Sequence, residues 1–234
     1  MTFSFYELYS FMSITHLNTG RMTKRRDNQL PKPAGRRERR RAETRERLYQ
    51  TAMKLFAERG FFDTSTEAIT EAADVGQGTF FNYFPTKDHV LIALSEKQIG
   101  KVGNALHEAE AGDRSIRDVL HRLMHAIAEE PTRSAPLTRS LLAAFVGSEE
   151  AREFTGETMA RGRNSLAQII KFGQGRKEIR HDRRAMDLAM TFQRNVLGTL
   201  LLWSIRPNGN VSSWLERTFE DFWDVATSKG DSPQ

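Results

Sequence analysis

Apolar residues recur every three or four positions through most of the chain, which is the spacing of one face of an α-helix. In the stretch Glu43 to Arg59, Leu48, Leu55 and Phe56 fall on one such face. Gly60 follows this stretch, at the position where a left-handed residue commonly ends a helix. We therefore expect a helix here whose apolar face belongs to a core and carries no chemistry of its own.

Two shorter helical patterns follow, separated by a tight turn. The first runs from Thr66 to Ala73 and the second from Gln77 to Phe84, where a proline stops it. Between them, Asp74 tolerates the left-handed conformation of a tight turn, and Gly76 adopts it freely. The pattern predicts a helix-turn-helix over residues 65–84, a unit whose second helix reads bases in the major groove of DNA.

The remaining sequence is helical as well. From Thr86 to about Ala111, Leu94, Gln98 and Val102 keep one helical period. Further apolar periods predict helices around 116–127, 137–145, 154–173, 188–203 and 214–223. We expect an all-α chain with an N-terminal three-helix helix-turn-helix domain, followed by a six-helix C-terminal bundle. The expected boundaries are 1–35 for a disordered basic extension, 42–102 for the first domain, 103–228 for the second and 229–234 for a tail.

Charge is distributed unevenly along the chain. The 234 residues include 35 Lys and Arg against 30 Asp and Glu, and the excess lies before Leu48. Residues 21–41 form a basic arm, broken by Pro31 and Pro33, whose composition does not support a packed core. We expect this arm to be mobile in the free protein and to contact DNA phosphates next to the helix-turn-helix. The alternative is a solvated charged tail.

The first twenty residues do not fit a targeting segment. Glu7 lies inside the apolar part and the basic residues come after it, whereas a secretory signal begins with basic residues. We interpret Met1 to Gly20 as a disordered tail or as the product of an upstream start, with Met22 the true start. The sequence has no cysteine and no apolar run of about 18 residues. We expect a cytoplasmic protein with no membrane span, disulfide or cofactor.

Several spaced motifs resemble the DNA-binding domain of the tetracycline-repressor (TetR) family of bacterial transcription regulators, over roughly Ala42 to Leu94. The matching residues are Leu55-Phe56-Ala57-Glu58-Arg59-Gly60-Phe61, Thr64-Ser65, Ile69, Gly78-Thr79 and Asn82-Tyr83-Phe84-Pro85-Thr86-Lys87. The sequence departs from the family at the turn, where Asp74-Val75-Gly76 stands in place of a common Gly-Val-Ser. It also has Gln77 where the family often has a basic residue.

The second short helix carries the candidate base-reading residues. An amide such as that of Gln77 can pair with adenine through two hydrogen bonds, and the methyl group of Thr79 can contact a thymine methyl. The full set of expected base-reading residues is Gln77, Gly78, Thr79, Phe81 and Asn82. Phe80 and Phe84 are expected in the core. The resemblance implies phosphate contacts from Thr64, Ser65, Tyr83 and Lys87, and we add Arg40, Arg41 and Arg45 of the arm and first helix.

The resemblance also implies that the C-terminal bundle holds an effector pocket and that its last two helices pair with a second subunit. Candidate pocket residues are Met124, His125, Phe145, Met159, Phe172 and Gln193. Candidate residues of the dimer seam are Phe192, Leu200, Trp203, Trp214 and Phe222. From spacing alone, packed core is at least as good an interpretation of each of them. The expected effector is an unidentified neutral or lipophilic small molecule.

Three hypotheses for function remain open at this stage. The first is a homodimeric repressor that a small molecule releases from palindromic double-stranded operator DNA. The second is a constitutive helical DNA-binding protein without an effector. The third is a helical enzyme or metal-binding protein, because His121, His125 and Glu129 share one helix face. We favour the first hypothesis and expect neither a metal nor an enzyme, since no nucleotide-binding, metalloprotease or serine-hydrolase motif is present in the sequence.

Overall fold

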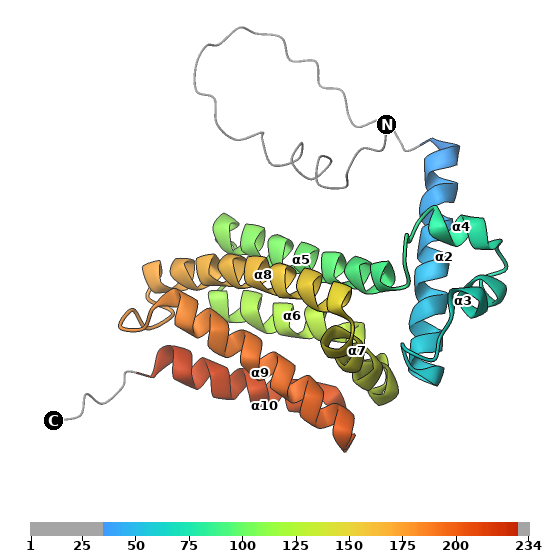
Figure 1. Ribbon diagram of the computed structural model, residues 1–234. Coiled ribbons are helices and arrows are strands. Elements are labelled where there is room, and N and C mark those ends of the chain that lie inside the picture. The colour runs from blue at the N-terminus through green and yellow to red at the C-terminus, as the bar shows by residue number, and fades with distance from the viewer. Residues whose placement is uncertain (1–34, 229–234) are drawn as a thin grey trace, which may run out of the picture. The chain divides into compact units, whose positions relative to one another are not determined.

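The computed structural model describes residues 35–228. The expectations for residues 1–34 and for the tail 229–234 lie outside the described residues. Within the described part, Arg40 and the residues that follow it form one compact unit, separate from the unit that ends at Arg39. The architecture below is that of the unit beginning at Arg40 (Figure 1).

Every regular element in the described range is helical, which confirms the all-α expectation. The helices are α2 (Arg36–Arg59), α3 (Thr66–Ala72), α4 (Gln77–Phe81), α5 (Asp88–Ala111), α6 (Ile116–Glu129), the 3-10 turn η1 (Pro131–Arg133), α7 (Ala135–Gly147), α8 (Glu149–Gly175), α9 (Ala185–Ile205) and α10 (Val211–Thr227). None of them has a long enough apolar run to cross a membrane, as far as the described residues go.

Helix α2 begins seven residues before the expected start. The basic arm was expected to be mobile as far as Arg41, but residues 36–41 are helical. Arginine is a good helix former, and the Glu38 carboxylate accepts a hydrogen bond of 3.0 Å from the backbone N–H of Gly35, which satisfies one of the free groups at the helix start. Gly60 ends the helix with φ of 91°, as the sequence predicted.

The helix-turn-helix has the expected turn but a shorter second helix. Ser65 caps α3 by accepting a hydrogen bond of 3.1 Å from the N–H of Ala68, and Asp74 has φ of 51°. Gly76 is extended, with φ of −70°, and gives α4 no side-chain cap. We expected α4 to reach Phe84, but it ends at Phe81. The chain then tightens into a turn, because the residue before a proline is disfavoured in the helical conformation.

The three helices α2, α3 and α4, which we call the head, share one hydrophobic core. Phe56, Ile69, Phe80 and Phe84 are fully or almost fully buried in it. This burial confirms the expectation that Phe80 and Phe84 belong to the core. The same core includes residues of α5 and of the bundle. Leu137, Leu141 and Ala144 of α7 are part of it. The head and α7 therefore contribute to one core.

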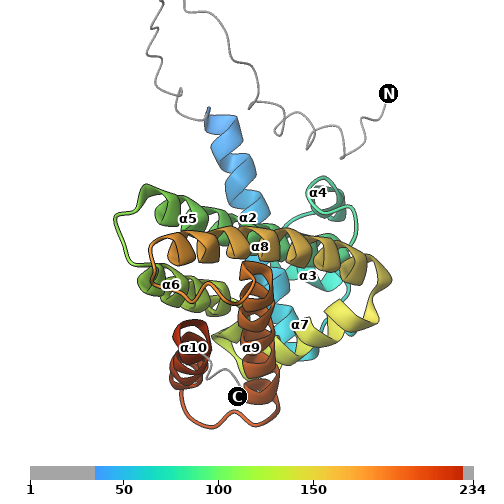
Figure 2. The same ribbon diagram turned by 90° about the vertical axis from the view of Figure 1, so that its left-hand side faces the viewer.

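Helices α5 to α10 form the expected six-helix bundle. Figures 1 and 2 both show α5 beside α8, and α9 beside α10. Helix α5 ends at Ala111, as the sequence predicted, and Gly112 caps it with φ of 83°. The boundary expected between residues 102 and 103 falls inside α5, which supplies Leu94 to the core of the head and Val102 to the core of the bundle. Both regions thus share one continuous helix.

Candidate nucleic-acid interface and effector cavity

The side of α4 that was expected to read bases is open to solvent. Gln77, Gly78 and Asn82 are exposed, Thr79 is half-buried, and the Phe81 side chain is 47% exposed. The phenylalanine before Phe81 is buried and anchors the helix to the head. An exposed polar face with one solvent-facing aromatic ring can enter a major groove and contact base edges and thymine methyl groups.

Gln77 is held by a residue of the preceding helix. Its side-chain amide donates a hydrogen bond of 2.9 Å to the carboxylate of Glu67 in α3. Hydrogen bonds from its own backbone N–H and from Ser65 lower the pKa of Glu67, so the carboxylate is ionised at neutral pH. The amide oxygen of Gln77 is left to accept, and its orientation depends on Glu67.

Basic side chains lie next to the two aromatic residues that follow α4. The Arg41 guanidinium lies 5.9 Å from the ring centre of Tyr83, and that of Arg45 lies 5.2 Å from the ring centre of Phe84. Arg40 and Arg41 are exposed, whereas Arg45 also approaches Glu96 at 3.8 Å. The aromatic contacts bring guanidinium groups of α2 to the end of the reading helix.

Two of the expected phosphate-binding residues have structural roles instead. The Lys87 ammonium donates to the carbonyl oxygens of Phe61 at 2.7 Å, of Thr64 at 2.8 Å and of Phe62 at 3.4 Å. Burial lowers the pKa of Lys87. Thr64 is buried, and its hydroxyl donates a hydrogen bond of 2.6 Å to the Gly60 carbonyl. Both side chains fix the loop between α2 and α3, so we correct their assignment.

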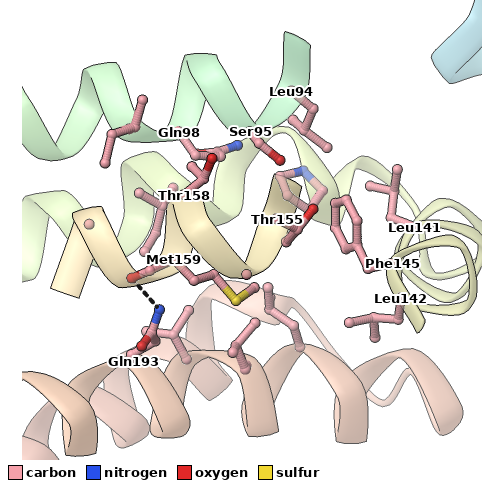
Figure 3. Close-up of a pocket in the computed structure, with 18 of the residues that line it drawn as sticks. Leu94, Ser95, Gln98, Leu141, Leu142, Phe145, Thr155, Thr158, Met159 and Gln193 are labelled. Atoms are coloured by element: carbon pink, nitrogen blue, oxygen red, sulfur yellow. Dashed lines mark hydrogen bonds between the residues drawn. The ribbon is translucent and has the colours of Figure 1, made fainter. Parts of the chain in front are cut away.

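A cavity of about 570 Å³ lies between α5, α7, α8 and α9 (Figure 3). Its walls are mostly aliphatic and aromatic, and its size is typical of sites for small molecules. Three of the residues predicted to form an effector pocket line it: Phe145 of α7, Met159 of α8 and Gln193 of α9.

The other three expected pocket residues do not line this cavity. Met124 is fully buried in the core of the bundle, and Phe172 packs against that same core. His125 borders a separate hollow between α6 and α10. The expectation was wrong for these three because a helical period does not reveal which part of a buried face meets a neighbour and which part meets a void.

The expected dimer seam is also corrected. Phe192, Leu200, Trp203 and Phe222 are buried within the protomer, and Phe192 and Phe222 pack edge to face at 5.1 Å between ring centres. Trp214 is half-buried, and its indole N–H donates to the Asn208 carbonyl at 2.9 Å. Their aromatic surface is used inside one protomer.

A different set of apolar side chains on the last two helices faces solvent. At the end of α9, Leu202 is 60% exposed and Ile205 is 61% exposed, and Leu201 of the same helix is also exposed. On α10, Val225 is exposed. Sequence reasoning missed these residues, although the run from Leu200 to Leu202 held a signal. Three consecutive leucines in a helix cannot all face one core.

The two histidines considered as metal ligands meet a different carboxylate from the expected one. His121 and His125 of α6 approach Glu216 of α10, with Nε2 to oxygen distances of 2.8 and 2.9 Å. These ligand atoms lie within 4.8 Å of one another, and Glu129 is not part of the group. The contacts hold α6 against α10, and we assign them that structural role.

Polar contacts join the start of α5 to the segment that connects α7 and α8. The Ser148 hydroxyl, which caps α8, also donates to the Asp88 carboxylate. Glu150 accepts a hydrogen bond of 3.1 Å from Thr86 and lies 3.4 Å from Nδ1 of His89. We call this group the junction. It ties the helix that leaves the head to the helices that enclose the cavity.

Comparison with known proteins decides the family. Residues 48–94, which contain the helix-turn-helix and the start of α5, match the model for "Bacterial regulatory proteins, tetR family". These residues are a domain of the TetR family. The resemblance seen in the spaced motifs of the sequence is thereby confirmed.

The TetR fold extends through the rest of the described chain. A putative TetR-family regulator from Syntrophomonas wolfei has the same fold, with a TM-score of 0.68 and 18% identity, over 82% of this chain and 99% of that one. The Thermus thermophilus repressor FadR, in complex with lauroyl-CoA, has a TM-score of 0.56 and 25% identity over 81% and 99% of the two chains.

Matches to curated sequences are shorter. The repressor KstR of Rhodococcus jostii is 22% identical over 121 residues, which make up 51% of this chain and 57% of that protein. The chain thus spans about half the length of the curated relatives it matches.

Proposed function

We propose that the protein is a sequence-specific DNA-binding transcriptional regulator, a repressor that a small-molecule effector releases from a palindromic operator. One observation carries the proposal. The solvent-exposed reading face of α4 stands on a core that α7 shares, and α7 also forms a wall of the cavity. A ligand in the cavity therefore acts on a helix that supports the reading head.

Two leucines make this connection specific. Leu94 of α5 and Leu141 of α7 line the cavity, and both are buried in the core of the head. A ligand that displaces either leucine disturbs the core of the head. A well-packed core does not deform gradually, so the head is expected to change position as a unit. The ligand then favours a state in which the two heads no longer fit successive grooves.

The junction gives a second route between the same regions. Helix α8 lines the cavity through Thr155, Thr158 and Met159, and its first turn is tied to the first turn of α5 through Glu150 and Ser148. A shift of α8 caused by a ligand is thus passed to the point where the chain leaves the head. This is the differential contact that an allosteric release requires.

Dimerisation follows from the size of the head and the exposed residues of the last helices. One five-residue reading helix buries too little surface to select a site, so such heads act in pairs on DNA with two-fold symmetry. We propose that the exposed side chains Leu201, Leu202 and Ile205 of α9 and Val225 of α10 form the seam. Their burial in a four-helix contact removes an apolar patch from water.

The relatives support a lipophilic effector. The Thermus thermophilus FadR structure contains lauroyl-CoA, and a Bacillus subtilis FadR structure of 17% identity and TM-score 0.62 contains stearoyl-CoA. The mostly apolar cavity of this chain suits a molecule with a large apolar part. A regulator of operator DNA works where the chromosome is, which we propose is the bacterial cytoplasm.

Selection of random DNA duplexes with the purified protein tests this function. We expect an inverted repeat to be enriched, and we expect its affinity to fall steeply as the salt concentration rises. A panel of lipophilic molecules is then screened for release of that duplex. Failure to bind any duplex selectively at low salt would overturn the DNA-binding role. Binding that no ligand relieves would leave the constitutive DNA-binding alternative.

A further inference from the structure

Gln98 of α5 carries an unusual pair of polar atoms. Its side-chain oxygen and nitrogen are both buried, and neither has a hydrogen-bond partner among the described residues. Gln98 lines the cavity and its amide points into it, opposite Thr158 of α8 (Figure 3). A primary amide offers two N–H donors and an accepting oxygen. Burying these groups away from water without hydrogen bonds costs free energy.

A second glutamine in the same cavity gives the contrast. Gln193 of α9 donates to the Met159 carbonyl at 3.3 Å and accepts from the Arg163 guanidinium at 3.1 Å. Its amide is therefore engaged at both ends by the protein. Of the two glutamines that line the cavity, only Gln98 has side-chain donors and an acceptor that a bound ligand can use.

The charge of the cavity limits what can enter. Arg152 of α8 is the one charged residue among those that line it within the described chain, and it is exposed. Its guanidinium donates to the Val146 carbonyl at 3.0 Å. The interior surface thus offers hydroxyls and amides, while the guanidinium groups of Arg152 and Arg163 are engaged by the Val146 carbonyl and by Gln193. An ionised group carried inside would lose its hydration without compensation, which is strongly unfavourable.

We propose that the effector is a neutral, predominantly apolar molecule whose single buried polar group is a hydroxyl or amide that both donates to and accepts from Gln98. This inference rests on the proposed function only in calling the ligand an effector. A group with both properties donates to the oxygen of Gln98 and accepts from its nitrogen, whereas a carboxylate can only accept from the nitrogen. The apolar remainder of the ligand fills the space between Phe145, Met159 and Leu141.

Ligand binding without DNA tests the proposal. Displacement of an environment-sensitive dye is measured with 1-dodecanol, dodecanamide, sodium dodecanoate and lauroyl-CoA, on the full-length protein. We expect the alcohol and the amide to bind at least tenfold more tightly than the carboxylate and the CoA thioester. Equal or tighter binding of either anionic probe would overturn the proposal, as would failure of all four to displace the dye.

A substitution separates a ligand-reading role from a structural one. Gln98→Leu replaces the unpaired amide with an apolar group of similar size, so the free protein should melt at an equal or higher temperature while its affinity for dodecanol falls about tenfold. Gln193→Leu is the matched control, and it should lower the melting temperature because it breaks two internal hydrogen bonds. A lower melting temperature for Gln98→Leu with unchanged dodecanol affinity would contradict the assignment.

The two proposals fail in different ways. If dodecanol binds through Gln98 but does not release operator DNA, the assignment of the polar subsite stands and the ligand-released repressor is wrong. If a carboxylate or a CoA thioester releases the operator at concentrations where the neutral probes do not bind, the repressor stands and the neutral ligand is wrong.

Discussion

The carboxylate of Glu67 accepts a hydrogen bond of 2.9 Å from the side-chain amide of Gln77, across the turn of the helix-turn-helix. The Gln77 side chain, which we propose reads a base, is therefore oriented before DNA is present. An ordered amide loses less conformational entropy on binding than a free one. The same carboxylate places a negative charge close to the expected position of the DNA backbone, so its two effects on binding are opposed.

Replacement of Gln77 should relax sequence selection at one position. In Gln77→Ala, the two-point contact with a base is lost, and we expect discrimination to fall by about 1–3 kcal/mol at one base pair of each half-site. Titrations against operator variants with single base changes measure this. A loss of affinity that is the same for every variant would show that Gln77 does not read a base.

Replacement of Glu67 should separate orientation from charge. Glu67→Gln keeps an acceptor for the Gln77 amide and removes the negative charge, so affinity should rise for all duplexes while the base preference stays. Glu67→Ala removes both, and the preference at the Gln77 position should weaken as well. Mobility shifts at two salt concentrations distinguish these outcomes, with Glu71→Gln of the same helix as the control. Identical behaviour of Glu67→Gln and Glu67→Ala would contradict an orienting role.

Loss of the Lys87 ammonium should act mainly on stability. Lys87→Met removes the ammonium that donates to the carbonyl groups of Phe61 and Thr64, and we expect the free energy of unfolding to fall by about 1–3 kcal/mol. Chemical denaturation measures the change. Lys54→Met is the control, because the side chain of Lys54 is largely exposed. Unchanged stability together with uniformly weaker DNA binding would instead restore the phosphate contact expected from the sequence.

Glu150 should transmit the effector signal without taking part in either binding event. In Glu150→Ala, the contacts with Thr86 and His89 are lost while the cap on α8 from Ser148 remains. We expect operator and effector affinities, measured separately, to stay within about twofold, and the coupling between them to fall by roughly 0.5–2 kcal/mol. Glu149→Ala removes a carboxylate from the same turn and serves as the control. An unchanged coupling would rule out the Glu150 contacts as a route.

Charge placed in the proposed seam should separate the subunits. Leu202→Glu and Ile205→Glu put carboxylates into the exposed apolar patch of α9, where a dimer would bury them without partners. Sedimentation should show monomers, and operator affinity should drop steeply because one head binds alone. Val146→Glu, at another exposed apolar position, should leave the oligomeric state unchanged. A dimer that survives both substitutions in α9 would place the seam elsewhere.

The helical architecture could be predicted from the sequence because helix formation is largely local. The apolar period gave most helices, and Gly60 and Asp74 indicated turns because these residue types accept the left-handed conformation. The start of α2 and the end of α4 were missed. Both depend on competition between helix and turn at a few residues, where Glu38 and Pro85 decide the outcome.

The candidate sites could be predicted only in part, because they depend on contacts between distant segments. The exposed residues of α4 were found since a family motif and a helical face coincide there. The carbonyl groups that engage Lys87 lie more than 20 residues away in the sequence, and no local pattern reveals them. Gln98 did leave a signal, a polar residue on the apolar stripe between Leu94 and Val102, but such a residue gains meaning only once the void beside it is known.

Helix α5 is a rigid connection between the head and the bundle. It runs without interruption for 24 residues, about 36 Å, from the exit of the head past the cavity. Since no flexible linker absorbs motion between Leu94 and Val102, a pivot of a few degrees near the middle of this rod becomes a displacement of ångströms at its ends. In the symmetric pair proposed above, the two displacements would add, so a small ligand in the cavity would change the distance between the two heads.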